Sequence, residues 1–260
     1  MNQPLAYVHP GANIAKNVVI EPFTTVHNNV QIGQGSWIGS NVTIMEGARI
    51  GKNVSIFPGA VISAIPQDKK FDDEDTITQI GDNTTIRECV TINRGTKDRD
   101  KTVIGSDCWI MAYSHIAHDC IVGDNCIFSN NSTLAGHITV GNHVVLAGMT
   151  AVQQFCSIGK HAFITGGSLV RKDVPPYVKA AREPLSYVGI NSIGLRRRGF
   201  DTDKIREIQN IYRFLYQKNY NNSQAVAIIE AEMEATPERD EILEFIKSSQ
   251  RGIMKGYFTT

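Results

Sequence analysis

The chain has 260 residues, enough for a sizeable core in one domain with an appendage. Its 26 Lys and Arg balance 26 Asp and Glu, and this zero net charge argues against broad binding to nucleic acid or to an anionic surface. No stretch approaches the roughly 20 apolar residues of a membrane-spanning helix, and the N-terminus lacks the basic and apolar segments of a secretory signal. We therefore predict a cytoplasmic protein with no nucleic-acid partner and no stable membrane insertion.

Aliphatic residues recur every six positions along most of the chain. The repeat runs from Ile14 to Ile62, resumes at Ile80, and continues unbroken from Ile104 to Val170. This period fits neither an amphipathic helix nor a long alternating strand, and it is typical of a hexapeptide solenoid. Three hexapeptides form one triangular coil, and parallel ladders between coils bury a continuous aliphatic column. We predict an all-β solenoid, a parallel β-helix, over residues 1–186.

Two further positions of the repeat have a regular composition. Glycine often follows the aliphatic residue directly, as at Gly33, which indicates a backbone conformation or a close approach that a Cβ would hinder. The fourth position after the aliphatic residue holds Ser, Thr, Ala, Val or Cys, so we predict a small, inward-facing packing position. The cysteines in that position, expected to be structural thiols rather than metal ligands or disulfide partners, are Cys108, Cys120, Cys126 and Cys156.

Two charged segments interrupt the repeat, at positions 63–79 and 93–103. Charged side chains cannot lie unpaired in an aliphatic column, so both segments are predicted to loop out. Loops on a rigid scaffold often carry ligand contacts, and the alternative is a solvated insertion without a function.

The repeat ends at Val170, and residues 187–260 are predicted to form an α-helical domain. One helix is expected to open at Asp201, a second to run near Ser223–Ala235, and a third to start after Pro237. The apolar face of the first comprises Ile205, Ile208, Ile211, Tyr212 and Leu215.

The 18-residue coil predicts which side chains stack on the outer surface. His118, Gly136 and Gln154 are 18 residues apart, so they form one column with a spacing of about 5 Å. Asp119 and His137, followed by Phe155, form the column beside it. An imidazole, a carboxylate, a second imidazole and an amide are therefore expected to meet on one outer edge.

This set of groups suits acyl transfer. The imidazole of His118 can take the proton of a substrate hydroxyl, and Asp119 can orient the ring and stabilise its cation. The N–H of Gly136 can hold the developing oxyanion. Because the column contains no serine or cysteine, direct transfer in a ternary complex is favoured over a covalent intermediate. The alternatives are solvated or structural histidines, and a zinc site made with His115 and His137, as in the hexapeptide carbonic anhydrases.

Several segments together resemble the acyl-carrier-protein–UDP-N-acetylglucosamine O-acyltransferases of lipid A biosynthesis. They are 115–120, 130–137, 148–156, 173–177 and 194–200, and the likeness covers essentially the whole chain. The resemblance implies left-handed coiling, and transfer of an (R)-3-hydroxyacyl group from its carrier-protein thioester to the 3-hydroxyl of UDP-N-acetylglucosamine. It implies no cofactor beyond the phosphopantetheine of the carrier, and a homotrimer with active sites between subunits.

The resemblance also implies roles for individual residues. His118 would be the general base, Asp119 its orienting partner, and the Gly136 N–H the donor to the thioester carbonyl. Substrate would be bound by Asp68, Lys70, His115, His137, Gln154, Asn191, Arg197 and Arg198, and Gly166 would leave room for a long acyl chain in its groove.

Some residues depart from the family pattern, and alternatives to these roles remain open. Gln153 and Ile193 depart from the residues common in the family, so nucleotide contacts are expected to differ in detail. Without the resemblance, Arg196, Arg197 and Arg198 would be interpreted as the basic edge of a solvated helix start, or as a docking point for an acidic carrier protein. The alternative enzyme, a UDP-glucosamine N-acyltransferase, should carry an N-terminal uridine-binding domain, which is not expected here because the repeat begins by Val8.

Overall fold

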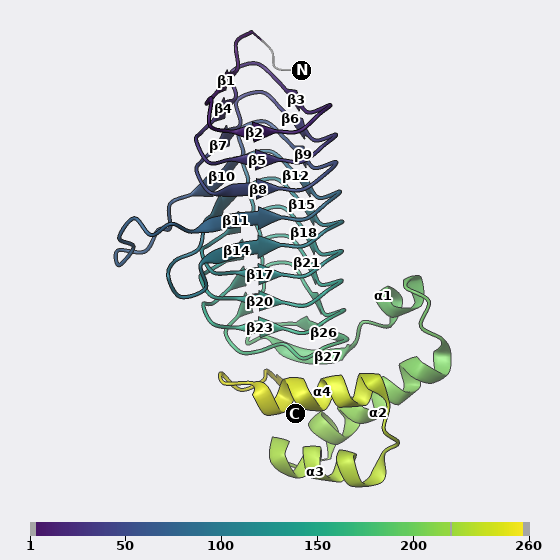
Figure 1. Cartoon of the computed structure of the whole chain (residues 1–260). Coiled ribbons are helices and arrows are strands. Elements are labelled where there is room, and N and C mark those ends of the chain that lie inside the picture. The colour runs from purple at the N-terminus through teal and green to yellow at the C-terminus, as the bar shows by residue number, and fades with distance from the viewer. Residues whose placement is uncertain (1–3, 219, 257–260) are drawn as a thin grey trace.

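The computed structural model of the chain describes residues 4–218 and 220–256. Short parallel strands stack into a left-handed β-helix with three flat faces, and four helices follow at its C-terminal end (Figure 1). The predicted fold class is confirmed.

The chain visits three sheets in turn, once per coil. The first sheet contains β1 (Tyr7–Val8), β4 (Thr25–Val26), β7 (Thr43–Ile44), β10 (Val61–Ala64), β13 (Thr91–Asn93), β16 (His115–Ile116), β19 (Thr133–Leu134), β22 (Ala151–Val152) and β25 (Leu169–Val170). The second contains β2 (Asn13–Ile14), β5 (Gln31–Ile32), β8 (Ala48–Ile50), β11 (Ile77–Ile80), β14 (Lys101–Ile104), β17 (Ile121–Val122), β20 (Thr139–Val140) and β23 (Ser157–Ile158). The third contains β3 (Val19–Ile20), β6 (Trp37–Ile38), β9 (Ser55–Ile56), β12 (Thr85–Ile86), β15 (Trp109–Ile110), β18 (Ile127–Phe128), β21 (Val145–Leu146), β24 (Phe163–Ile164), β26 (Val178–Ala181), β27 (Ser186–Ile190) and β28 (Lys255–Gly256).

Tight turns join the sheets at three corners. We call the turn from the first sheet to the second the first corner, the turn from the second to the third the second corner, and the turn back to the first sheet the third corner. Residues that are one coil apart pair in register, as His115 does with Thr133. Each corner is therefore a column of turns in which one position repeats from coil to coil.

The core is the predicted aliphatic column. Ile20, Ile56, Ile110 and Ile164, like the other repeat aliphatics from Ile20 onward, are at most 5% exposed. The small position is also buried as predicted, and none of the described cysteines is in a disulfide. Burial raises the pKa of the Cys120 thiol to about 12, which keeps it protonated and unreactive.

The structure separates two roles that glycine could have had in the repeat. A Cβ on Gly33 would lie 2.4 Å from the carbonyl oxygen of Gly51 in the next coil, so this glycine allows the coils to approach. The left-handed conformation is adopted two residues later in the turn, as by Asn17 (φ 58°), Asp119 (φ 60°) and His137 (φ 64°). Asn, Asp and His are the non-glycine residues that tolerate this region best.

Both charged segments leave the β-helix at the first corner (Figure 1). The loops span residues 65–76 and 94–100, which is shorter than predicted. The reason is that β11 and β14 pair over four residues each, from Ile77 with Lys101 to Ile80 with Ile104, and so extend the ladder into the expected loops.

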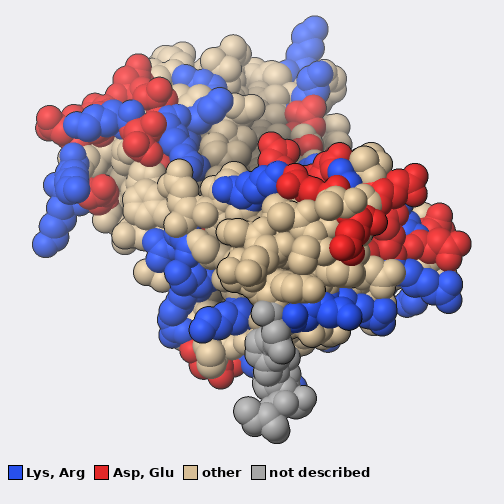
Figure 2. Space-filling model, turned by 90° about the horizontal axis from the view of Figure 1, so that it is seen from below, with Lys and Arg blue, Asp and Glu red and all other residues tan. Residues whose placement is uncertain are grey.

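The C-terminal part packs helices beneath the last coils. The helices are α1 (Ser192–Arg197), α2 (Thr202–Gln217), α3 (Asn222–Glu232) and α4 (Pro237–Ser248). The predicted boundary at 186/187 falls inside β27, which pairs with β26 and runs to Ile190. From the helical end, acidic side chains gather over one end of the domain, and basic side chains lie along its other edges (Figure 2).

Local sequence explains the helix ends. Asp201 caps α2 by accepting a hydrogen bond from the Lys204 N–H, and the predicted apolar face of α2 is buried. The second predicted helix begins one residue earlier and ends three residues earlier than expected, because Met233 is extended. The short helix α1 was not predicted. Among the described helices, none has the length and hydropathy needed to cross a bilayer.

Candidate active site

The first corner collects the groups that the sequence placed in two columns. The turns after β16, β19 and β22 lie on successive coils and carry His118, Gly136 and Gln154 at the same position. The two loops leave the same corner on the coils just before them, after β10 and β13. The β-helix therefore brings both insertions to the edge that holds His118.

His118 and Asp119 form a close pair. His118 Nδ1 lies 2.7 Å from Asp119 Oδ2, which assigns the N–H to Nδ1 and leaves Nε2 engaged by no described residue. Burial would raise the pKa of Asp119, but the hydrogen bonds from His118 and from Thr96 outweigh it, so this pKa lies below its ordinary value. Asp119 is thus an anion that holds the ring in one tautomer.

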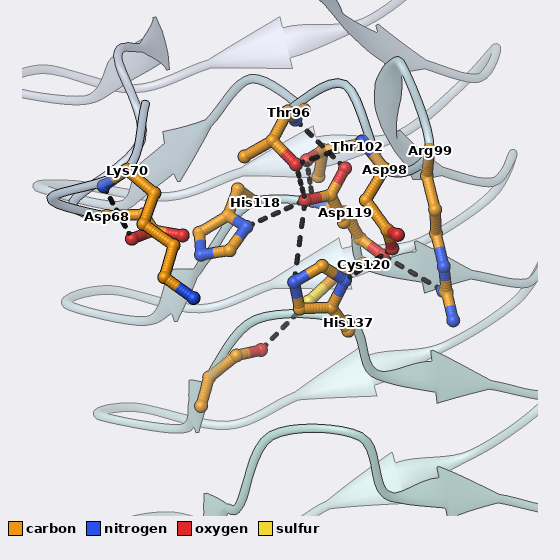
Figure 3. A network of polar contacts seen from close by, with 12 residues as sticks. Asp68, Lys70, Thr96, Asp98, Arg99, Thr102, His118, Asp119, Cys120 and His137 are labelled. Atoms are coloured by element: carbon orange, nitrogen blue, oxygen red, sulfur yellow. Dashed lines mark hydrogen bonds and ion pairs between the residues drawn. The ribbon is translucent and has the colours of Figure 1, made fainter. Parts of the chain in front are cut away.

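Asp119 is not on the outer surface, contrary to the expectation from the repeat. Its exposure is 0%, because the 94–100 loop folds over it. Thr96 donates to the carboxylate from its N–H (2.9 Å) and its hydroxyl (2.7 Å), and Arg99 donates to the Asp119 carbonyl (3.0 Å). Figure 3 shows these contacts converging on Asp119 behind the His118 ring. The sequence did not predict roles for Thr96 and Arg99. The one signal in the sequence was that both residues belong to an insertion at the corner that carries His118.

Gly136 lies directly beneath the His118 ring. A Cβ there would be 2.7 Å from His118 Cε1 and 2.8 Å from Nε2, so only glycine allows the ring its position. The Gly136 N–H donates no hydrogen bond within the described residues, although the residue is buried. At the second corner some of the equivalent amides are capped, as Ser106 N–H is by Asp124 (2.8 Å) and Asp124 N–H is by Asn142 (3.0 Å). The Gly136 amide is therefore free for an external acceptor.

We expect Gly136→Ala to lower kcat by roughly 10- to 100-fold, because the methyl group would push the imidazole from its position while the backbone N–H remains. The measurement is kcat with both substrates saturating, together with the thermal unfolding midpoint. A variant that unfolds at the wild-type temperature and keeps its full kcat would contradict this role.

The other predicted histidines differ in their surroundings. His137 stacks on Phe155 with ring centroids 4.6 Å apart, and its Nδ1 lies 3.0 Å from Asp98 Oδ2, out of line for a hydrogen bond. His115 lies on β16, with Nδ1 2.7 Å from the Thr91 hydroxyl. Burial lowers the pKa of His115, so it is neutral. Gln154, next in the His118 column, is exposed.

The first loop contributes Asp68 and Lys70. Their turn is closed by the Lys70 N–H, which donates to Asp68 Oδ1 (3.0 Å). Figure 3 shows both residues on the side of the His118 ring that faces away from Asp119. Lys70 is exposed and Asp68 is partly exposed, so both are available to a ligand at this edge.

One group of described side chains could hold a metal ion. It consists of His118, Asp119 and His137, whose ligand atoms lie within 4.8 Å of one another. This is not the three-histidine set of the zinc alternative, because His115 is engaged by Thr91. His118 and Asp119 already bond to each other, and Thr96 donates to both oxygens of Asp119, so a metal would have to displace existing hydrogen bonds.

The predicted nucleotide-binding residues lie elsewhere in the chain. Arg197, Arg198 and Asn191 line a pocket of about 480 Å³ on the outer face of the third sheet, with Ile193 at its rim. Asn191 caps α1 by accepting from the Gly194 N–H (3.2 Å). Arg198 donates to the His143 carbonyl at the second corner (3.2 Å). One chain therefore does not bring these residues to the His118 edge.

Gly166 is also remote from His118. It lies at the third corner, between β24 and β25. A Cβ at this position would be 3.1 Å from the carbonyl oxygen of Gly148 in the preceding coil, which is a tight contact. The predicted site residues thus lie at or near the first corner, on the outer face of the third sheet, and at the third corner.

A stack of histidines adjoins the arginine pocket at the second corner. His161 lies between His143 (centroids 4.7 Å) and Tyr177 (5.5 Å), and burial, with nearby His143 and Arg198, lowers its pKa to about 4. Its Nδ1 has no hydrogen-bond partner among the described residues. Below pH ~6.5 the His161 ring binds a proton in the unfolded chain, whereas in the folded chain it stays neutral down to about pH 4. The free energy of unfolding therefore decreases as the pH falls from about 6.5 towards 4.

We expect His161→Phe to remove this acid sensitivity, because phenylalanine keeps the stacking and cannot be protonated. Between pH 7 and 4.5, the wild type should lose about 2 kcal/mol more unfolding free energy than the variant, allowing for its partial exposure. Urea unfolding at fixed protein concentration measures the difference. Equal losses in the two proteins would contradict the assignment.

A β-helix of hexapeptide repeats with a histidine–carboxylate pair at its corner defines a transferase of the hexapeptide class. Residues 29–64 and 101–136 match the bacterial transferase hexapeptide model. Residues 173–254 match a model described as UDP-N-acetylglucosamine O-acyltransferase, domain 2.

Known relatives cover nearly the whole chain. An acyl-carrier-protein–UDP-N-acetylglucosamine O-acyltransferase of Chlorobaculum parvum is 55% identical over 96% of this chain and 95% of its own. One of Chlorobium phaeobacteroides is 58% identical over 95% and 94%. The crystal structure of a UDP-N-acetylglucosamine acyltransferase from Bacteroides fragilis superposes with a TM-score of 0.97, at 47% identity, over 98% of this chain and 100% of that chain. The chain belongs to the acyl-carrier-protein–UDP-N-acetylglucosamine O-acyltransferase family.

Proposed function

We propose that this chain transfers an (R)-3-hydroxyacyl group from acyl carrier protein to the 3-hydroxyl of UDP-N-acetylglucosamine, the first step of lipid A biosynthesis. The observation that carries the proposal is the His118–Asp119 pair. Its 2.7 Å contact leaves Nε2 as a base beside the free amide of Gly136. The names of the relatives support the two substrates.

The reaction proceeds by direct transfer in a ternary complex. His118 Nε2 takes the proton of the sugar 3-hydroxyl as its oxygen attacks the thioester carbonyl carbon. The carbon–sulfur bond of the tetrahedral intermediate then breaks, and the imidazolium returns the proton to the departing phosphopantetheine thiolate. Asp119 stabilises the transient imidazolium through its hydrogen bond to Nδ1 and is not itself protonated.

The carbonyl oxygen gains negative charge during the attack. The Gly136 N–H donates to no acceptor among the described residues, so it is available to an acceptor on a ligand. A thioester oxygen at this amide would receive a hydrogen bond that strengthens as the oxyanion forms. The same amide thus favours both binding and the transition state.

We propose that the active site is completed by a second subunit in a homotrimer. His118 lies at the first corner, whereas Arg197 and Arg198 line a pocket on the third sheet. A heterologous threefold contact would set the first corner of one chain beside the third sheet of the next and generate three equal sites. The guanidinium groups would then bind the diphosphate of the nucleotide, which they match in charge and geometry.

The roles of the remaining residues are part of the same proposal. His115, His137 and Gln154 would line the cleft, with Asp68 and Lys70 of the first loop closing it, and Asn191 would hold α1 at the nucleotide pocket. Gly166 would leave space for a long acyl chain. The N-acyltransferase alternative is not favoured, because relatives with the O-acyltransferase name match this chain over about 95% of their length.

The function is tested by incubating the purified protein with UDP-N-acetylglucosamine and a series of 3-hydroxyacyl carrier-protein thioesters of increasing chain length. We expect an acylated nucleotide, resolved by mass spectrometry, whose bond is cleaved by mild base as an ester is. No acylated nucleotide with any thioester would overturn the proposal. Acylation of the free 2-amine of a UDP-glucosamine derivative, supplied in a parallel reaction, would favour the alternative.

A further inference from the structure

The 94–100 loop between β13 and β14 reaches the catalytic edge through several of its side chains. Thr96 bonds to the Asp119 carboxylate, Asp98 approaches His137, and Arg99 bonds to the Asp119 backbone and to the Thr139 hydroxyl (3.4 Å). Thr96 is only 8% exposed, whereas the flanking Lys97 and Asp98 are exposed. The loop therefore turns one small polar residue inward onto the catalytic carboxylate.

The geometry of these bonds is specific. The Thr96 N–H occupies Asp119 Oδ1 at 2.9 Å, and the Thr96 hydroxyl occupies Oδ2 at 2.7 Å. Oδ2 is also the oxygen that His118 Nδ1 contacts at 2.7 Å. A carboxylate can rotate about its terminal torsion unless both oxygens are held. Thr96 thus fixes the plane of Asp119, and it shares with His118 the oxygen that sets how strongly the imidazolium is stabilised.

We propose that Thr96 is a positioning residue of the transfer reaction. It orients the Asp119 carboxylate towards His118 and weakens the electrostatic interaction between this carboxylate and the imidazole. This inference rests on the proposed function of the His118–Asp119 pair. The hydroxyl donates to Oδ2 and so withdraws part of its charge from His118. Its removal would leave a carboxylate that is less well oriented and that holds a proton on the imidazole more tightly.

Other titratable or charged groups face the pair and must remain unchanged in a test. They are His115 on β16, His137 with Asp98 beside it, Arg99 on the same loop, and Asp68 with Lys70 on the first loop. A substitution at Thr96 leaves these side chains unchanged. Thr96→Val also removes the hydroxyl that accepts from the Asp98 N–H (3.3 Å), whereas Thr96→Ser keeps this acceptor. The Thr96 N–H bond to Oδ1 also survives.

The experiment compares Thr96→Val with Thr96→Ser. Valine is close in size and lacks the hydroxyl, whereas serine keeps the hydroxyl and lacks the methyl group. We expect Thr96→Val to lower kcat by roughly 10- to 100-fold with little change in the KM for UDP-N-acetylglucosamine, since a hydrogen bond to a charged group is lost. We also expect the acidic limb of kcat against pH to move to higher pH by about half a unit. Thr96→Ser should restore both quantities towards wild type.

Thr102→Val is the matched control. Thr102 is also buried, on β14, and its hydroxyl accepts from the Asp119 N–H (2.9 Å). We expect its pH profile to keep the wild-type acidic limb even where the unfolding midpoint falls. A Thr96→Val enzyme with wild-type kcat and acidic limb would overturn the inference, as would Thr96→Ser behaving like Thr96→Val. If the wild type itself makes no acylated nucleotide, it is the proposed function that fails.

Discussion

Replacing His118 with alanine is expected to lower kcat by about 10²- to 10⁴-fold, the range for loss of a positioned general base. The physical reason is that no other described group lies in its place. Asp119 is fully buried behind the ring, and His137 stacks on Phe155. The measurement is the initial rate of acylated nucleotide formation under saturating substrates, with nucleotide binding followed separately by calorimetry.

The control is His27→Ala, an exposed histidine in a turn at the same corner, four coils nearer the N-terminus and before both loops. It should keep the wild-type rate, which separates loss of the base from loss of any corner histidine. Nucleotide binding by His118→Ala should remain measurable, because the predicted phosphate contacts are on the third sheet. A His118→Ala rate within a few-fold of wild type would remove His118 from the mechanism.

Mixed trimers are expected to recover activity from two inactive parents. His118→Ala removes the base, and Arg197→Glu places a negative charge in the nucleotide pocket without altering the bond from Arg198 to His143. Each variant alone should be nearly inactive at nucleotide concentrations below the wild-type KM. In a trimer containing both kinds of chain, one junction pairs an intact His118 with an intact Arg197, so the rate should be about one third of wild type.

The chains are co-expressed with two different affinity tags, and trimers that carry both are isolated by two successive purifications. Mixed trimers of wild type and His118→Ala, purified in the same way, provide the scale for partial activity. A rate no higher than that of the parents would show that the base and the arginine act within one chain. A size measurement giving a monomer or dimer would exclude the threefold arrangement itself.

The sequence alone predicted the β-helix, because one buried side chain in every six residues is a local rule that each repeat obeys independently. The same period places His118, Gly136 and Gln154 in one column, as the structure does. It also explained the buried cysteines and the two loops, since a charge cannot replace an aliphatic residue in the column. Helix caps such as Asp201 are likewise local and were readable from the sequence.

The tertiary structure decided what the repeat could not encode. Insertions have no register, so only the folded 94–100 loop shows that Thr96 and Arg99 cover Asp119 and turn a surface carboxylate into a buried anion. The short helix α1 was missed because it is held by the Asn191 cap and by contacts with the β-helix rather than by its own pattern. The period alone places residues along the axis of the β-helix, whereas the folded corners and loops decide which side chains lie together.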